Sequence, residues 1–366
     1  MQKQPFDLPK LPPKIDYEKL ITSMTKAHAS LARLDALLYQ LKNPKLLSRT
    51  LATKEAVLSS QIEGTQATLS EVLEHEAQGI EKEDTSKEKD FREILNYRHA
   101  LEKGVELLKD KPVTENFIKD LHSVLLSSAR GHHKNPGNFR RDQVYIGKQG
   151  LGIEHASYVP PLPMFIPELF SNFENYINSD NEKDKLVQIA IAHYQFEAIH
   201  PFMDGNGRIG RLLISLMLYE KKLLTFPFIY LSEFFEEHRQ EYYDLLRGVS
   251  ESNDWESWIL FFLNGLDIQA IKAQETAKKI LDLHNSVNEQ VISFNSRFSH
   301  DFLEALFTNP FFTSPVIKKM AHIENSKTLF GLIGKFLKAG IISDITPDKK
   351  RNKIYRFDAL ADILKR

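Results

Sequence analysis

The chain of 366 residues contains no cysteine, which excludes disulfide bonds, cysteine nucleophiles and thiolate metal ligands and is typical of a reducing compartment. An excess of one charge is also lacking. The 48 Lys and Arg residues balance 49 Asp and Glu residues, which argues against a globally basic nucleic-acid binder. No apolar run approaches the roughly 18 residues that span a bilayer, and residues 1–14 lack the apolar core of a signal peptide. We therefore expect a cytoplasmic protein that makes no membrane contact.

Hydrophobic residues make up 42% of the chain, and they recur mainly at the spacing of three and four that is typical of amphipathic helices. The sequence therefore predicts a mainly α fold, and this length suggests roughly two domains or slightly more. The helices expected in the first part of the chain cover residues 16–42, 47–62, a segment from about 69, 91–109, 114–126, 167–177, 186–199, 208–224, 233–247 and 254–266.

Residues 200–211 (HPFMDGNGRIGR) form a short polar loop that leads into the second of two expected helices. Pro201 disfavours the helical conformation at His200, so the first helix should end there. Gly205 and Gly207 allow backbone conformations with positive φ, which can turn successive N–H groups toward one point. The free N–H groups and the positive dipole end of the second helix lie beside the same loop, so we expect an anion-binding site.

The charged residues of this stretch indicate which anion it would bind. Arg208 and Arg211 are three residues apart, so they project from one side of the helix, and a guanidinium matches phosphate geometry. Asp204 would repel a bare phosphate unless a hard cation such as Mg²⁺ bridges the two groups. The residues alone therefore predict a Mg²⁺–polyphosphate site. His200 would be a general base at its edge, because an imidazole with a pKa of about 6.5 can be neutral at pH 7.

The same stretch resembles the signature of the Fic family of protein adenylyltransferases, His-Pro-Phe-x-Asp/Glu-Gly-Asn-Gly-Arg-x-x-Arg, and it fills every specified position. The resemblance implies a Fic-type helical bundle and a nucleotidyltransferase. Such an enzyme uses ATP and Mg²⁺ to AMPylate a Ser, Thr or Tyr hydroxyl of a target protein, and it also AMPylates itself. His200 would be the catalytic base, and Asp204 would hold the Mg²⁺. The nucleotide-binding residues would be Asp204, Gly205, Asn206, Gly207, Arg208, Ile209, Gly210 and Arg211.

Two further groups of side chains are less specific. We expect the side chains of Phe202 and Ile209 to anchor the loop in the core. Tyr242, Tyr243 and Ser250 occupy positions where family members line the adenine pocket, but these side chains could equally be packing residues.

A second, shorter motif lies at residues 59–64 (SSQIEG). On its own it is typical of a helix C-terminus, with Gly64 just past the last turn. It also matches the inhibitory motif of the family, Ser/Thr-x-x-x-Glu-Gly/Asn, at Ser59, Glu63 and Gly64. The resemblance implies that Glu63 pairs with Arg211 and blocks the γ-phosphate position, so the enzyme would be autoinhibited. It leaves open a reverse, de-AMPylating activity that uses the same glutamate.

Residues 140–163 are rich in Gly and Pro, with a β-like run at 143–146 and an extended segment before Pro160. This pattern favours a β-hairpin, with an ordinary turn as the alternative. It resembles the flap of the family, whose strand edge holds the target segment. The residues that we expect to dock the target are Tyr145, Tyr158 and Val159.

The last 70 or so residues have a different organisation, beyond a polar connecting helix expected over 267–296. Short helices at 302–307, 313–320 (Ser314 as N-cap) and 328–339 precede a predicted hairpin, 341–345 with 353–357. This order is the outline of a winged helix-turn-helix domain. From residue 310 onward, twelve Lys and Arg residues face five Asp and Glu residues, so we expect contact with DNA or with a protein.

The expected domains follow from these patterns. Residues 1–110 form an N-terminal helical region that carries the inhibitory helix (about 47–64), and residues 111–266 form the catalytic core with the flap. The connecting helix (267–296) leads to the winged helix (297–366). The resemblance implies a homodimer.

Two other functions fit some of the residues. His193, Glu197, His200 and Asp204 could ligate a transition metal in a metal-dependent phosphohydrolase, although the spacing is not HExxH and two arginines would crowd a cation. The chain could also be a non-enzymatic, winged-helix DNA-binding regulator whose helical domain senses a nucleotide.

Overall fold

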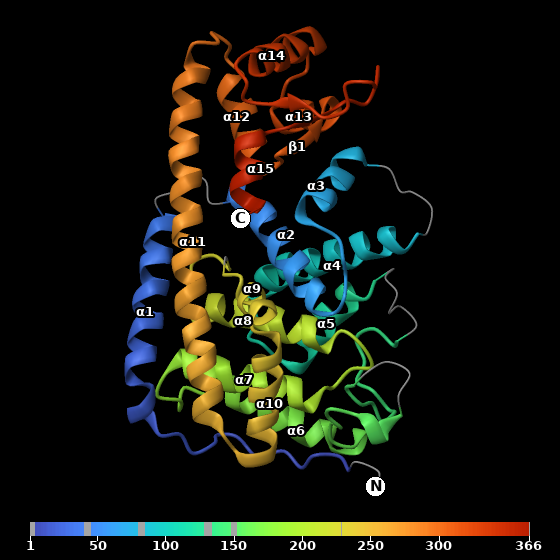
Figure 1. Ribbon diagram of the computed structural model, residues 1–366, viewed down its shortest axis with the longest axis vertical. Coiled ribbons are helices and arrows are strands. Elements are labelled where there is room, and N and C mark those ends of the chain that lie inside the picture. Colours follow the sequence, from blue (N-terminus) through green and yellow to red (C-terminus); the bar gives the residue numbers. More distant parts are fainter. Residues whose placement is uncertain are drawn as a thin grey trace.

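The computed structural model describes residues 4–39, 45–79, 85–127, 134–147, 152–227 and 229–365, and it is mainly helical (Figure 1). The helices of the first two thirds are α1 (Tyr17–Tyr39), α2 (Lys45–Ile62), α3 (Leu69–Gln78), α4 (Ser86–Leu107), α5 (Glu115–Leu125), α6 (Ile166–Ile177), α7 (Lys185–Ile199), α8 (Asn206–Glu220), α9 (Leu231–Glu237) and α10 (Arg239–Ser252). They are followed by α11 (Trp255–Ile292), α12 (Ser299–Thr308), β1 (Phe311–Thr313), α13 (Ser314–Met320), α14 (Ser326–Lys338), β2 (Ser343–Asp344), β3 (Ile354–Arg356) and α15 (Asp358–Lys365).

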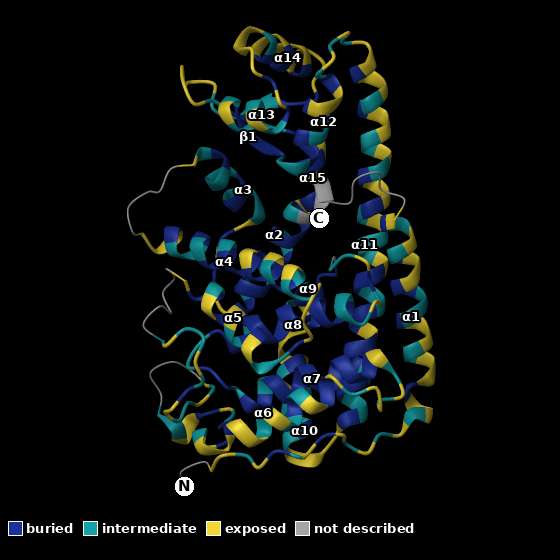
Figure 2. Ribbon diagram, turned by 180° about the vertical axis from the view of Figure 1, so that it is seen from behind, coloured by how far each residue is buried: buried dark blue, intermediate teal, exposed yellow. Residues whose placement is uncertain are grey.

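Helices α7 and α8 form the centre of the bundle. Nearly every residue of α7 is buried, which explains why its sequence is apolar on all sides rather than along one stripe (Figure 2). Helix α8 packs antiparallel to it, and α4, α5, α6 and α11 surround the pair. The loop that joins α7 to α8 therefore starts and ends on two of the most constrained elements of the fold.

The long helix α11 differs from the expectation. It is continuous from Trp255 to Ile292, so the boundary expected at residue 266 lies inside one helix. Its first part packs along α1, where Ser30 bonds to Asp267 and Gln274, and its later part continues past α1 to contact α12 and α15 (Figure 1). Ala270, Ala277 and Ile280 are buried, so the helix does not run free of the core beyond residue 266. Among the described residues, no helix is both long enough and apolar enough to cross a bilayer.

A single helix expected over 233–247 is in fact two. His238 lies at φ −114° and ψ 34°, outside the helical range, and separates α9 from α10. The break lets both elements bury aromatic side chains: Phe234 of α9 packs on Phe261 of α11, whereas Tyr242 of α10 contacts His193 of α7.

The C-terminal elements contain a small antiparallel sheet of order β1-β3-β2. The hairpin expected from the sequence corresponds to β2 and β3, and β1 was not expected. Helix α13 begins at Ser314 with Thr313 as its N-cap, so the expected cap was one residue late. This region packs on α2 and α3, where Phe311 and Ile354 meet Leu73 and Ala77 in one apolar cluster.

Two glycines give a direct test of this packing. A Cβ at Gly265 of α11 would lie 2.5 Å from a ring carbon of buried Phe234, whereas a Cβ at Gly331 of α14 would meet nothing within 4 Å. We expect Gly265→Ala to destabilise the protein by about 1 kcal/mol, because overpacking outweighs the gain in helix propensity. Gly331→Ala should stabilise it by about 0.5–1 kcal/mol. Urea unfolding of both variants measures the sign of the change in the free energy of unfolding. Equal changes in the two variants would contradict the packing described for Gly265.

Candidate active site

The loop between α7 and α8 starts with a residue in an unusual conformation. His200 lies in the left-handed region, with φ 49° and ψ 59°, and its N–H donates to Phe196 O at 3.0 Å. The left-handed conformation costs a non-glycine residue about 1–2 kcal/mol. Pro201 disfavours the alternative, a right-handed helical conformation at His200. The helix therefore ends where the sequence predicted, and the turn points the backbone of His200 into the loop.

Asn206 closes the loop from its other end. Its Oδ1 accepts from Phe202 N and its Nδ2 donates to Phe202 O, both at 2.8 Å, and the side chain is buried. Gly205, at φ 77°, supplies the left-handed turn before α8 begins. The sequence predicted Asn206 as a nucleotide ligand; the structure instead uses both ends of its amide to hold the loop.

The first turn of α8 faces the loop and offers backbone donors. The N–H groups of Asn206, Gly207 and Arg208 precede the first intrahelical bond, from Ile209 N to Gly205 O at 3.0 Å. These N–H groups have no acceptor within the helix, which is the anion-binding property of a helix N-terminus.

Two expected nucleotide ligands do not face this turn. The side chain of Ile209 is fully buried in the core, and its N–H is the donor of that first intrahelical bond. Gly210 contacts α7, since a Cβ there would lie 2.2 Å from Oε1 of Glu197. Helical periodicity places positions 209 and 210 toward the bundle, so the structure uses both positions for packing.

The two arginines of the loop are buried and bind different partners. Arg208 donates to Glu93 Oε2 at 3.3 Å and to Asp204 Oδ1 at 3.2 Å. Arg211 donates from Nη2 to Glu63 Oε1 at 2.6 Å. The predicted ion pair between Glu63 and Arg211 is therefore present.

Ser59 completes the surroundings of Arg211. The Nε of Arg211 donates to Ser59 Oγ and its Nη2 donates to Ser59 O, both at 2.9 Å. Gly64 lies at φ 100°, which lets the chain turn sharply just after Glu63. All three residues of the short motif thus serve one arrangement, in which the end of α2 presents a carboxylate to α8.

Glu63 occupies the place where an anion would bind. A Cβ at Gly207 would lie 2.4 Å from Glu63 Oε1, so the carboxylate lies directly against the first turn of α8. Burial alone would raise the pKa of Glu63, but the charge and hydrogen bond of Arg211, and then the charge of Arg208, lower that pKa below its usual value. Glu63 is therefore ionised at neutral pH, as an anion at this position should be.

A buried carboxylate, that of Glu55, lies near the ion pair, whose own carboxylate is 39% exposed. Glu55 accepts hydrogen bonds from Ser232 Oγ and from Tyr97 OH, and burial raises its pKa to about 8. Sequence reasoning missed Glu55 and also Glu93, the partner of Arg208. For Glu55 a signal existed, because Glu55, Ser59 and Glu63 recur every four residues and so share one face of α2.

His200 is placed to accept a proton. Its Nδ1 donates to Glu197 O at 3.3 Å, which leaves Nε2 with the lone pair that a base needs. Burial, then the nearby charge of Arg140, lowers the pKa of His200 to about 4, against the raising effects of Glu63 and Asp204. The imidazole is therefore neutral at pH 7, and it is half-buried rather than sealed from solvent.

Asp204 fits the expected role at a divalent cation. Its carboxylate is 39% exposed, and Oδ1 already accepts from Gly205 N at 2.6 Å. A single oriented carboxylate beside a phosphate-binding turn is the usual protein share of a Mg²⁺–nucleotide site. Within the described residues, no group of three or more His, Asp and Glu side chains assembles as a metal centre of its own.

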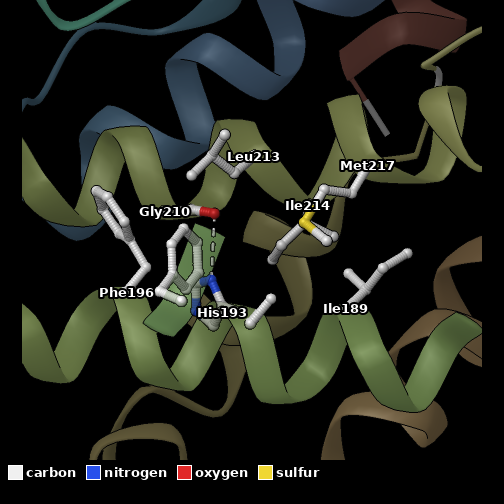
Figure 3. A pocket seen from close by; sticks show the side chains of 9 residues that line it. Ile189, His193, Phe196, Gly210, Leu213, Ile214 and Met217 are labelled. Atoms are coloured by element: carbon white, nitrogen blue, oxygen red, sulfur yellow. Dashed lines mark hydrogen bonds between the residues drawn. The ribbon is translucent and has the colours of Figure 1, made fainter. Parts of the chain in front are cut away.

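The alternative metal centre is therefore not formed. Figure 3 shows His193 among apolar side chains, with its Nδ1 donating to Gly210 O at 3.2 Å. Its Nε2 accepts from Tyr242 OH at 2.9 Å, and burial lowers the pKa of His193 to about 3. Because both ring nitrogens have partners, His193 is a packing residue, and a phosphohydrolase built on it is not supported.

The expected adenine-lining residues divide into two kinds. Tyr242 is buried and donates to His193, and Ser250 Oγ pairs with Tyr194 OH at 2.9 Å, so both hydroxyls are used inside the core. Tyr243 is only partly buried, and the charges of Glu63 and Arg211 affect its pKa, which burial raises. The same two charges also affect the pKa of Tyr242, so both tyrosines lie near the ion pair.

The flap is less regular than the sequence predicted. A single antiparallel bridge, Ile146 with Tyr158, replaces the expected hairpin, and the tip at 148–151 lies outside the described residues. Tyr145 is 42% exposed, whereas Val159 is buried and its carbonyl accepts from Phe6 N at 3.0 Å. The N-terminal arm thus lies beside Tyr158 and Val159, where Phe6 stacks on Tyr158, so the carbonyl of Val159 is already used within the chain.

His122 of α5 also holds the loop, and no sequence motif indicated it. Its ring stacks on Phe202 at a centroid distance of 3.7 Å, and Nε2 donates to Asp204 O at 2.9 Å. Nδ1 accepts from Gly137 N at 2.9 Å, and burial lowers the pKa of His122 to about 4. The neutral ring therefore connects the loop to the segment that leads into the flap.

Comparison with known proteins agrees with this geometry. The model of the Fic/DOC family N-terminal region matches residues 21–106, and the Fic/DOC family model matches residues 112–218. The two together cover more than half of the chain, which belongs to the Fic/DOC family.

The chain also resembles curated and solved relatives. A protein adenylyltransferase Fic of Drosophila grimshawi is 31% identical over 170 residues, 45% of this chain and 31% of the relative. A probable protein adenylyltransferase of Aquifex aeolicus is 29% identical over 207 residues, 55% of this chain and 56% of the relative. The chain thus spans about a third to a half of the length of these relatives.

Two solved structures share the fold. A Fic family protein from Desulfovibrio desulfuricans G20 has a TM-score of 0.60 at 21% identity and covers 94% of this chain and 98% of its own. Fic-1 from C. elegans has a TM-score of 0.55 at 22% identity, over 71% of this chain and 75% of its own.

The buried histidine of α5 gives a test by pH. An unfolded imidazole takes up a proton near pH 6.5, whereas the pKa of His122 in the fold is lowered to about 4. Between about pH 4 and pH 6.5 the unfolded state binds more protons at this imidazole than the folded state does. The stability that His122 contributes is therefore complete above about pH 6.5 and is lost as the pH falls toward 4. We expect the stability difference between wild type and His122→Gln to shrink by up to about 1.4 kcal/mol per pH unit on acidification.

Urea unfolding at about pH 6 and about pH 5 measures this difference. Other groups, Glu55 and Glu197 among them, titrate equally in both proteins and cancel. A difference that stays constant with pH would show that the ring is not held neutral.

Proposed function

We propose that the chain is a protein adenylyltransferase, which transfers AMP from ATP to a hydroxyl of a target protein and to itself. One observation carries the proposal: a carboxylate paired with buried Arg211 lies on the anion-binding turn of α8, beside the neutral imidazole of His200. Membership of the family and the relatives named as adenylyltransferases support it.

The residues divide the chemistry among themselves. His200 Nε2 takes the proton of the target hydroxyl, whose oxygen bonds to the α-phosphorus of ATP as the bond to the pyrophosphate oxygen breaks. The N–H groups of Gly207 and Arg208 and the guanidinium of Arg211 hold phosphate oxygens. Asp204 would hold Mg²⁺, which supplies charge neutralisation when bound. Most of the rate enhancement would come from positioning and from these fixed donors.

We further propose that Glu63 is an intramolecular inhibitor. As long as it binds Arg211, the arginine cannot hold the γ-phosphate, and Asp204 competes for Arg208 from the other side. A charge-assisted hydrogen bond contributes about 1.5–3 kcal/mol, or about ten- to a hundredfold in nucleotide positioning. Glu63 could also orient a water for removal of AMP. The target and the homodimer remain predictions.

Labelled ATP tests both parts of the proposal. We expect Glu63→Gly to raise self-labelling about ten- to a hundredfold over wild type, because Arg211 becomes free for the γ-phosphate. His200→Ala in the Glu63→Gly background should abolish the label. Mass spectrometry of co-incubated lysate proteins would locate the added AMP.

Glu63→Gln is the matched control, since it keeps the size of the side chain and removes its charge. It should release most of the inhibition if the ion pair is the cause. Label that survives His200→Ala would disprove the proposed base, and no label in any variant would favour the nucleotide-sensing regulator.

We propose that residues 297–365 form a winged helix that contacts a protein rather than DNA. The order of α13, α14, β2 and β3 and the exposed basic tip around Lys350 support the fold assignment. On α14, Phe330 and Leu337 are 56% and 36% exposed on the surface that would enter a groove of DNA. Exposed apolar side chains there favour a protein partner.

Titration with duplex DNA, followed by fluorescence anisotropy, tests this choice. We expect only non-specific binding, with a Kd of about 10⁻⁴–10⁻⁶ M that weakens steeply with salt. Replacing Lys349, Lys350 and Arg351 by Ala should remove that binding. Sequence-specific binding that survives physiological salt would show that the domain is a DNA reader.

A further inference from the structure

Arg140 lies at the junction between the flap and the loop of His200. It is 3% exposed, and its backbone N–H donates to Pro201 O at 2.8 Å. Its guanidinium donates from Nε to His200 O at 2.8 Å and from Nη2 to Pro161 O at 2.6 Å. One side chain therefore binds both the turn that carries the base and the end of the flap.

Weaker bonds complete this arrangement. Nη2 also approaches Ile199 O at 3.4 Å, and Nη1 donates to Asp142 O at 3.3 Å. Every partner is a backbone carbonyl. Two of these carbonyls, from Ile199 and His200, end α7, where the helix dipole is negative and favours a cation.

Among the described residues, no carboxylate compensates the charge of Arg140. In the described part of the chain Arg140 forms no ion pair with an Asp or Glu, and burial lowers its pKa to about 10. A buried cation without a counter-ion is costly unless its donors are all satisfied. A neutral residue would fill the space at a lower desolvation cost, so a simple packing role does not account for the charge.

We infer that Arg140 is a positioning residue for His200, which it holds in the left-handed turn while fixing the exit of the flap to the same turn. The inference rests on the proposed function. The guanidinium of Arg140 then sets the distance between His200 and the target hydroxyl that the flap presents, because it donates to His200 O on one side and to Pro161 O on the other. Lysine cannot replace it, because a single ammonium lacks the fixed fork of donors.

The charge of Arg140 has a second effect on the base. The charged groups near His200 are Arg140, Glu63 and Asp204, and its Nδ1 donates to Glu197 O. After burial, which is the main cause, Arg140 lowers the pKa of His200, whereas both carboxylates raise it. Loss of the guanidinium should therefore raise the pKa of His200 and move the acid limb of the pH–rate profile to higher pH.

The test uses Glu63→Gly as the active background, with Arg140→Met, Arg140→Lys and the neighbouring Arg141→Met as variants. Arg141 is exposed, so its variant is a matched control for loss of one arginine. We expect Arg140→Met to lower kcat about 100-fold, as misplacement of a catalytic group by about 1 Å does, with little change in KM for ATP. Arg140→Lys should keep the acid limb in place but recover little of kcat.

A second measurement does not depend on turnover. Hydrogen exchange should become faster in peptides that cover residues 142–147 and 199–205 of Arg140→Met, while exchange in α1 and α11 stays as in Arg141→Met. NMR titration should show a higher pKa for His200. If exchange, the pKa and kcat all match Arg141→Met, the inference is wrong.

The two proposals can fail separately. An inactive Glu63→Gly background would overturn the adenylyltransferase assignment, and exchange and titration would still decide the role of Arg140. A uniform loss of protection across the protein would show that Arg140 serves folding in general and would contradict a local positioning role.

Discussion

The structure depends on one buried cation. Arg211 of α8 is 3% exposed and extends to the end of α2, and a buried guanidinium needs an anion beside it. In the described state Glu63 supplies that anion, and the same position suits the γ-phosphate of a nucleotide. In the proposed function, inhibition and substrate binding are therefore two solutions of a single electrostatic requirement, and one anion would replace the other without leaving the guanidinium unpaired.

The surroundings of the loop follow a common rule. Asn206, His122 and Arg140 come from three different segments, and each donates to a backbone carbonyl of residues 199–204. Polar side chains thus replace the hydrogen bonds that a loop lacks, and the loop becomes as constrained as the helices on either side. The proposed base, His200, and the proposed metal-binding carboxylate, Asp204, are four residues apart and can keep a fixed geometry only under such constraint.

This rule explains how far the sequence could lead. The loop, the helix ends and the Glu63–Arg211 pair were predictable, because Pro201, the glycines and the two motifs are local signals. Glu93, His122 and Arg140 were not, since their partners are distant in sequence and leave no periodic pattern. The resemblance placed Asn206, Ile209 and Gly210 at the nucleotide. In the structure the side chain of Asn206 bonds within the loop, that of Ile209 is buried in the core, and Gly210 packs against α7.

The position of α2 indicates how the proposed inhibitory contact between Glu63 and Arg211 can be broken. Ser59 binds Arg211 through Oγ and through its carbonyl, and Arg239 donates to Ile62 O at 2.7 Å, so the last turn of α2 is fixed from two sides. Helix α12 packs against the start of the same helix. Movement of α2 as a body would break all these contacts at once. Gly64, by contrast, lies in open space at positive φ. In the proposed function, rotation of the Glu63 side chain at this turn is thus the least costly way to free Arg211, and Ser59 would keep the arginine oriented toward the incoming phosphate.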